Sequence, residues 1–262
     1  MKNLLNGACL ALLMSGTAAF ANDSVLAEIA KPEQWAIQTG DYANTRYSTL
    51  DKINKDNVKD LRVAWTFSTG VLRGHEGSPL VIGDVMYVHT PFPNNVFALD
   101  LNDNGKILWT YKPQQDPNVI AVMCCDTVNR GLSFADGMIL LSQADTTVVA
   151  LDAKTGEVKW STKVGDPAIG ETLTATTMPV HDKLMVGISG GEYGVRGRMT
   201  ALNLKDGSVA WKAYSTGPDD ELLVDPEKTT VLGKPIGKDS SLQSWEGDQW
   251  KIGGGTIWGW FS

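Results

Sequence analysis

A motif that recurs about every 50 residues constrains the fold of this chain more than any other feature. The tripeptide Ala-Leu-Asp or Ala-Leu-Asn begins at Ala98, Ala150 and Ala201, so the starts lie 52 and 51 residues apart. Each copy is followed by a Gly and then a Trp, which are Gly105 and Trp109, Gly156 and Trp160, and Gly207 and Trp211. This pattern is typical of two strands joined by a polar turn, a β-hairpin.

Two more strands precede each hairpin. In the clearest repeat we predict strands at 132–134, 138–142, 147–152 and 157–163. Four short antiparallel strands with a period near 50 residues are typical of a β-propeller blade, and a solenoid is the competing architecture. The Trp and Gly at fixed offsets favour blades, because an indole ring packs closely on a neighbouring blade where a Gly leaves room. We therefore predict an all-β propeller with four-stranded antiparallel blades and Trp docking motifs.

The two ends of the repeat region are incomplete. Residues 61–65 have the pattern of the last strand of a blade, with no partner strands before them, and residues 257–262 form an aromatic, strand-like end with no returning strand. Three complete repeats and two partial ones do not close a ring of four to eight blades. We therefore expect residues 22–262 to be roughly half a ring, the N-terminal portion of a longer protein.

The first 21 residues have the pattern of an export signal. Lys2 precedes an apolar run at 8–14, and small residues end in the Ala-Phe-Ala of 19–21. This predicts a signal peptide over 1–21, cleaved near Ala21. No later apolar run approaches the roughly 20 residues of a membrane span. A net charge of −7 without a Lys/Arg run argues against a nucleic-acid partner.

Adjacent cysteines, Cys124 and Cys125, remain after the signal is removed. Consecutive Cα atoms lie about 3.8 Å apart, whereas ordinary disulfides need at least about 4.4 Å. A strained eight-membered ring, a reduced pair and part of a metal site are all open alternatives, although export to an oxidising compartment favours the bond.

Glu192 follows a glycine-rich break at 189–191. A carboxylate there can ligate a hard cation such as calcium or a lanthanide, and the alternative is a solvated turn residue. A single Glu does not make a metal site, so any further ligands must come from elsewhere.

Together with the Trp repeat, four motifs resemble the large subunit of PQQ-dependent methanol dehydrogenases, where PQQ is pyrroloquinoline quinone. They are RGHEG at 73–77, CCDTVNRG at 124–131, SGGEYG at 189–194 and GGGTIWGW at 253–260. The likeness extends from about Trp35 to the end of the chain. The Gly-Gly-Glu and Ile-Trp-Gly-Trp motifs are more similar to those of the lanthanide-dependent branch than to those of the calcium branch. The resemblance implies an eight-bladed propeller, a periplasmic location and a bonded Cys124–Cys125 pair pressed against one face of the quinone.

The resemblance also implies the cofactor site. Trp258 is expected on the other quinone face, with Trp260 as the alternative if the register differs, and Glu192 as a ligand of a lanthanide ion or Ca²⁺. Arg130 is the expected carboxylate partner, paired with Glu76. The remaining expected cofactor-binding residues are Thr174, Ser189, Gly190, Gly191 and Thr256. The Asp base and the other metal ligands are expected beyond Ser262, so the chain as given is expected to be inactive.

The implied reaction is oxidation of methanol or another primary alcohol by hydride transfer to metal-bound PQQ, with electrons passed to a soluble cytochrome c. One alternative is a cofactor-free envelope propeller that scaffolds other proteins, and another is a related quinoprotein for larger alcohols or sugars. The scaffold has no use for Cys124, Cys125, Arg130 or Glu192. A homodimer is left open.

Overall fold

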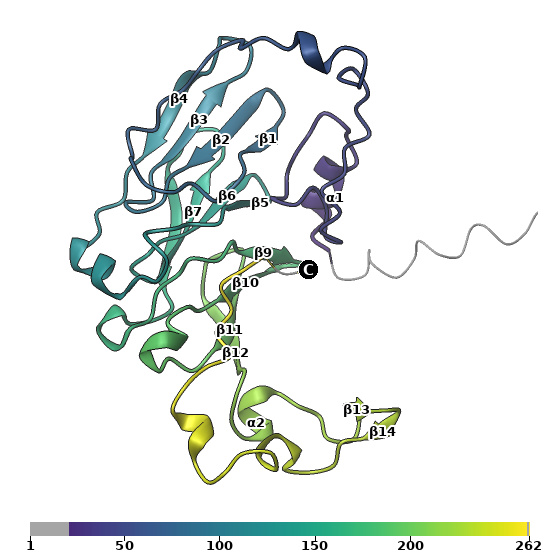
Figure 1. The fold of residues 1–262 in the computed structure, drawn as a ribbon, viewed down its shortest axis with the longest axis vertical. Coiled ribbons are helices and arrows are strands. Elements are labelled where there is room, and N and C mark those ends of the chain that lie inside the picture. Colours follow the sequence, from purple (N-terminus) through teal and green to yellow (C-terminus); the bar gives the residue numbers. More distant parts are fainter. Residues whose placement is uncertain (1–20, 261) are drawn as a thin grey trace, which may run out of the picture.

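The computed structural model describes residues 21–260 and 262, and in this part of the chain three four-stranded sheets form the body of the protein (Figure 1). The predicted signal peptide falls outside the described residues, apart from Ala21. Among the described residues, no helix combines the length and the apolar character needed to cross a membrane.

Each sheet is one blade, in which consecutive strands pair antiparallel. The first blade contains β1 (Leu80–Ile82), β2 (Val85–His89), β3 (Val96–Asp100) and β4 (Lys106–Tyr111). The second contains β5 (Leu132–Ala135), β6 (Met138–Ser142), β7 (Thr147–Asp152) and β8 (Val158–Lys163). The third contains β9 (Met178–Val180), β10 (Lys183–Gly187), β11 (Arg198–Asn203) and β12 (Val209–Tyr214). The predicted four-stranded antiparallel blades are therefore confirmed.

The repeated motif also sets a repeated irregularity. The register between the third and fourth strands shifts at Ala98/Leu99, at Ala150/Leu151 and at Ala201/Leu202, so each blade has a bulge at the same place in its Ala-Leu-Asp/Asn motif. In each blade the Ala of this motif pairs with the Trp of the fourth strand. Because a bulge re-aims the side chain beside it, we infer that it turns Trp109 and Trp160 toward the blade that follows each of them.

The tryptophans dock successive blades as predicted. The ring of Trp109 lies on Gly156, where a Cβ atom would come within 2.7 Å of the indole, and Trp160 lies on Gly207, where it would come within 2.5 Å. The two indole Nε1 atoms donate hydrogen bonds to Ala153 O at 3.0 Å and to Leu204 O at 2.8 Å. Each Trp thus joins its own blade to the Gly-containing turn of the following blade.

The segment at 61–65 forms no strand, contrary to the sequence pattern. Val63 is 81% exposed, and the described residues include no strand that pairs with this segment. Its Trp65 nevertheless lies on Gly105, at the docking position of the first blade. Residues 257–260 likewise form no strand. A strand requires a neighbour for its backbone hydrogen bonds, whereas ring packing on a Gly does not.

The core lies between blades. Leu140 of β6 packs with Leu184 of β10 and Leu202 of β11, and all three are fully buried. Burial of one such leucine contributes about 1.5–3 kcal/mol. Helix α1 (Asp23–Ile29) closes one side, and the side-chain oxygen of its cap Asn22 accepts from two backbone N–H groups while Nδ2 donates to His181 O at 2.7 Å. The N-terminal segment therefore fastens onto the second and third blades.

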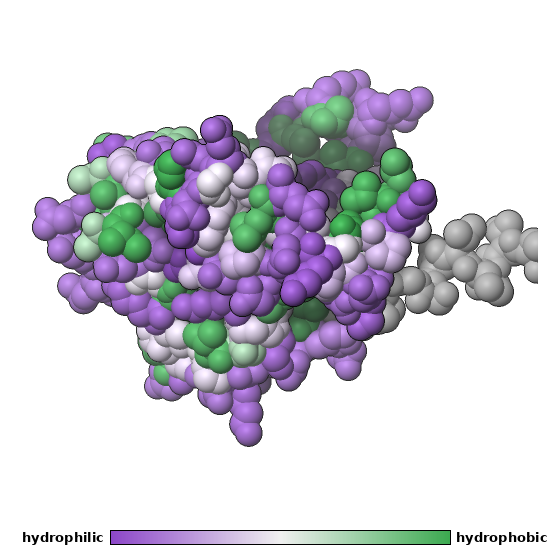
Figure 2. Space-filling model, turned by 90° about the horizontal axis from the view of Figure 1, so that it is seen from below, coloured by the Kyte–Doolittle hydropathy of each residue, from purple (hydrophilic) through white to green (hydrophobic). Residues whose placement is uncertain are grey.

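A lobe of residues 217–252 extends away from the third blade (Figure 1). It contains α2 (Asp219–Leu222) and the short hairpin of β13 (Thr230–Val231) and β14 (Lys234–Pro235). After the lobe, the chain returns along the third blade as residues 253–260. On the face shown in Figure 2, hydrophobic residues form separate small patches among mainly hydrophilic ones.

Candidate functional site

A cavity of about 160 Å³ lies where four loops meet. The loops follow the 3₁₀ helix at Pro117–Val122, precede β9, follow β10, and return from the lobe. The lining residues are Cys124, Cys125, Arg130, Thr174, Ser189, Gly190, Glu192 and Trp258. All eight belong to the set singled out from the sequence, which the fold brings together from positions up to 134 residues apart.

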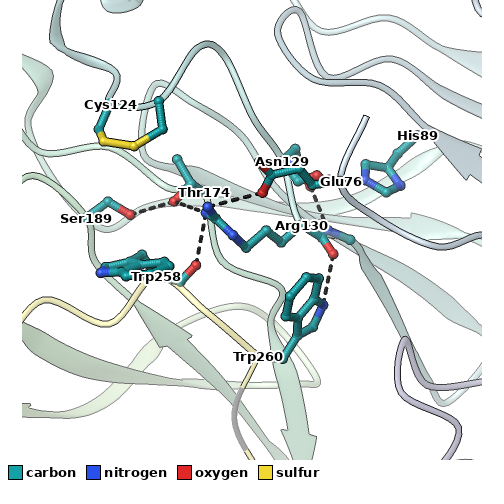
Figure 3. A network of polar contacts seen from close by, with 11 residues as sticks. Glu76, His89, Cys124, Asn129, Arg130, Thr174, Ser189, Trp258 and Trp260 are labelled. Carbon is teal, nitrogen blue, oxygen red and sulfur yellow. Dashed lines mark hydrogen bonds and ion pairs between the residues drawn. A yellow bond between two sulfur atoms is a disulfide. The ribbon is translucent and has the colours of Figure 1, made fainter. Parts of the chain in front are cut away.

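Arg130 is the centre of the polar network (Figure 3). Its Nη1 donates to Thr174 Oγ1 at 3.0 Å and to Trp258 O at 3.1 Å, and its Nη2 lies 3.1 Å from Glu76 Oε2. Its guanidinium carbon also lies 5.0 Å from the centroid of the Trp258 ring. The expected pairing of Glu76 with Arg130 is thus present. Because Glu76 pairs with Arg130 but does not line the cavity, it acts on the site through Arg130.

Two of the expected cofactor-binding residues, Thr174 and Ser189, form a pair through their hydroxyl groups. Thr174 Oγ1 and Ser189 Oγ lie 2.8 Å apart, and either can donate to the other. The backbone holds them there, because Arg130 N donates to Thr174 O at 3.0 Å and Ser189 pairs with Thr172 through its N–H and C=O groups. The hydroxyls therefore lie beside the Arg130 guanidinium, and this edge of the cavity presents several donors to an anionic group.

Cys124 and Cys125 are disulfide-bonded, which confirms the bonded alternative over the reduced pair. Cys125 and Asp126 adopt left-handed backbone conformations, with φ of 63° and 65°. Asp126 also pairs with Arg73 at 2.7 Å. The disulfide lies on one side of the cavity and the indole of Trp258 on the opposite side, with the Ser189 and Thr174 hydroxyls between them (Figure 3). A flat ring system fits this arrangement, with sulfur on one face and an aromatic ring on the other.

Glycines bring Trp258 to the cavity. A Cβ at Gly187 would lie 2.3 Å from Ile257 O, and one at Gly197 would lie 1.9 Å from Gly255 O, so only Gly admits the returning segment here. The backbone is held by hydrogen bonds from Gly254 N to Val195 O at 2.9 Å and from Ile257 N to Ile188 O at 2.9 Å. Trp258 therefore lines the cavity, with half of its surface exposed.

Trp260, the alternative stacking residue, occupies a different place. Its Nε1 donates to Arg130 O at 3.1 Å, and its ring lies against the guanidinium of Arg46 at 5.2 Å. Thr256 and Gly191 do not line the cavity, and a Cβ at Gly191 would lie 3.0 Å from Thr256 Oγ1. Of these residues, only Trp258 is placed to stack on a bound ring.

Glu192 lies in the 3₁₀ helix at Gly191–Tyr193 and lines the cavity. Its carboxylate is exposed and has no hydrogen bond or ion pair with the described residues. No group of three His, Cys, Asp or Glu side chains in the described part of the chain forms a metal site. Glu192 therefore fits a cation as one ligand among several, and the described residues alone do not form a complete ligand set.

Asn129 and His89 support Arg130, although neither was predicted as a site residue. The Asn129 side chain donates to Ser142 O at 2.7 Å and accepts from Gly131 N at 3.0 Å. His89 Nε2 donates to Asn129 O at 3.1 Å, and burial lowers the pKa of His89 to about 4. A single His within a strand gives no indication in the sequence that it supports a site residue. Asn129 could have been found, because it directly precedes Arg130 in the CCDTVNRG motif.

The comparisons with known proteins agree with this geometry. The family model described as "PQQ: Glucose/ethanol/alcohol dehydrogenase, beta-propeller domain" matches residues 35–158. The chain is 85% identical over its whole length to a putative dehydrogenase, XoxF, of Paracoccus denitrificans, of which it covers 44%. It is 68% identical, over 95% of its length, to a lanthanide-dependent methanol dehydrogenase of Methylorubrum extorquens, of which it covers 42%.

Two further matches agree. Over 93% of its length the chain is 50% identical to "Methanol dehydrogenase [cytochrome c] subunit 1" of Paracoccus denitrificans, of which it covers 40%. A solved structure of a europium-containing methanol dehydrogenase superposes with a TM-score of 0.84 at 48% identity, over 91% of this chain and 42% of that one. The chain thus spans less than half the length of these relatives.

Blades docked by tryptophans, with a cavity between their loops, define a partial β-propeller with a candidate ligand site. The homology is strong along the whole chain. The chain is strongly homologous to PQQ-family alcohol dehydrogenases, and its homologues include lanthanide-dependent methanol dehydrogenases.

Proposed function

We propose that this chain is part of an exported, periplasmic quinoprotein that oxidises methanol or other primary alcohols by hydride transfer to metal-bound PQQ. The observation that carries the proposal is the cavity, in which a disulfide and an indole lie on opposite sides of a donor-rich edge. The names of the relatives support methanol as substrate and cytochrome c as electron acceptor. The pattern of residues 1–21 supports export.

The residues of the cavity have complementary tasks in this proposal. The disulfide of Cys124 and Cys125 and the ring of Trp258 hold the two faces of the flat quinone, because stacking needs broad apolar surfaces. Arg130 binds a cofactor carboxylate through its guanidinium fork, and Thr174 and Ser189 donate from the same edge. Glu76 keeps Arg130 oriented through its 3.1 Å ion pair. When bound, the quinone supplies the two-electron acceptor chemistry that side chains lack.

Glu192 is the proposed ligand of the metal ion, and a lanthanide is favoured over calcium. Its free carboxylate at the cavity wall suits a hard cation, which binds oxygen ligands. Two relatives, at 68% and 48% identity, are named as lanthanide-dependent, and a solved structure at 48% identity contains europium. The remaining ligands and the Asp base belong, in this proposal, to the part of the relatives that this chain does not span.

Substitution of Glu192 tests the proposal. In protein expressed from the complete coding sequence, we expect Glu192→Ala to lose bound metal and methanol-dependent dye reduction while the blades remain folded. If Glu192 is only a surface residue, the change in stability should be no more than about 0.5 kcal/mol and activity should persist. Glu157→Ala, which removes an exposed carboxylate from a blade turn, is the matched control. Wild-type metal content and turnover in Glu192→Ala would refute the assignment.

A further inference from the structure

Outside the cavity, Arg196 contacts two aromatic rings, a carboxylate and a backbone carbonyl. Its guanidinium lies between two aromatic rings, 4.2 Å from the centroid of Tyr214 and 4.7 Å from that of Trp250. Its Nη2 donates to Thr216 O and to Glu221 Oε2, both at 2.5 Å. An arginine fork held between two rings and paired with a carboxylate is strongly fixed in place.

These partners lie at both ends of the lobe. Thr216 directly precedes the lobe, Glu221 belongs to α2, and Trp250 lies near the end of the lobe. The two ends also touch directly, because Thr216 Oγ1 donates to Trp250 O at 3.2 Å. A Cβ at Gly217 would lie 2.5 Å from Arg196 Nη2, so the start of the lobe packs tightly against this side chain.

The segment that leaves the lobe near Arg196 continues to the cavity. The backbone of Arg196 forms a parallel bridge with Gly254, and Gly197 N donates to Gly254 O at 2.7 Å. From Gly254 the chain follows the third blade to Trp258, whose ring lines the cavity. The point at which this segment leaves the lobe is therefore set by the same residue that ties the lobe ends together.

We propose that Arg196 is a positioning residue for Trp258. By holding both ends of the lobe, it fixes the start of residues 253–258 and so the place of the indole at the cavity wall. This inference rests on the proposed function only in taking Trp258 as the stacking face for the quinone. It assigns the lobe a role in building the site, although the lobe itself does not line the cavity.

Hydrogen exchange separates this role from simple anchoring of the lobe. In protein expressed from the complete coding sequence, we expect Arg196→Met to accelerate exchange of peptides covering 253–258 by about ten-fold or more, because ring, ion-pair and hydrogen-bond contacts are lost together. Exchange of the β6–β7 amides should be unchanged. Binding of PQQ, followed by its absorbance, should weaken by about ten-fold as well.

Lys251→Met is the matched control. Lys251 Nζ also lies over the Trp250 ring, at 5.2 Å, but its ion pair is with Asp248 inside the lobe. We expect this variant to leave both exchange at 253–258 and PQQ binding unchanged. Arg196→Lys keeps the charge without the fork, and we expect it to fall between wild type and Arg196→Met.

Faster exchange confined to 218–252, with 253–258 as in wild type, would overturn the proposal. If Arg196→Met does not fold, the same comparison of exchange at 253–258 and at 218–252 is made with Arg196→Lys. Faster exchange at 253–258 with unchanged PQQ affinity would support Arg196 as a positioning residue and refute the stacking role of Trp258. Failure of this inference and failure of the proposed function are therefore distinguishable.

Discussion

Substitution of Gly207 by Ala measures how much one Trp dock contributes to the fold. Gly207 has φ of +72°, and a Cβ there would lie 2.5 Å from Cε3 of Trp160. Trp160 is 8% exposed and hydrogen-bonded to Leu204 O, so it cannot move away freely. A left-handed Ala costs about 1–2 kcal/mol and overpacking of a fitted core costs about 1–3 kcal/mol. We expect Gly207→Ala to destabilise by about 2–5 kcal/mol in all.

Gly137→Ala is the control for backbone strain. Gly137 has φ of +74° and also lies in a blade turn, but a Cβ there would meet nothing within 4 Å. This variant should therefore cost only the backbone term, about 1–2 kcal/mol. The difference between the two variants isolates the contact with Trp160.

Denaturant unfolding of the two variants, followed by far-UV circular dichroism and Trp fluorescence, gives the comparison. We expect the midpoint of Gly207→Ala to lie clearly below that of Gly137→Ala, with an altered Trp fluorescence in the native state. Equal midpoints would show that the dock tolerates an added methyl group, and the reasoning on blade contacts would then be wrong.

Three more predictions follow from particular contacts. Cys124 and Cys125 should resist alkylation until a reductant is added, as mass spectrometry of the labelled peptide would show; labelling of both without reductant contradicts the bond. In the folded protein the pKa of His89 is about 4, below its ordinary value of 6.5. Its contribution to stability should therefore be full above pH 6.5 and be lost as the pH falls toward 4. In urea unfolding measured over this pH range, His89→Gln should lack this part of the pH dependence of the unfolding free energy. Burial raises the pKa of Glu171, but the hydrogen bonds and charge of Arg198 outweigh it and keep this pKa below its ordinary value. Glu171→Gln should therefore lower the free energy of unfolding by about 3–5 kcal/mol, and the double variant Glu171→Met/Arg198→Met should lower it clearly less. Equal losses of unfolding free energy in the two variants would refute this prediction.

The sequence by itself determined the blades. The strands at 138–142 and 147–152 coincide with β6 and β7, because short apolar runs bounded by turn residues are local signals and each repeat contains them. The docking of Trp109 and Trp160 also followed from fixed offsets. The pattern failed at 61–65, because a strand depends on a partner that local residues do not supply.

Only the tertiary structure decided the site. The motifs implied cavity residues through family resemblance, but the choice of Trp258 over Trp260 depended on how the returning segment lies on Gly187 and Gly197. Nothing in the sequence indicated the roles of His89 and Arg196. His89 acts through a contact with Asn129, 40 positions away, and Arg196 acts through contacts with both ends of the lobe. Such contacts are properties of packing in space, where close approach, burial and hydrogen-bond geometry are set by elements that the local sequence does not specify.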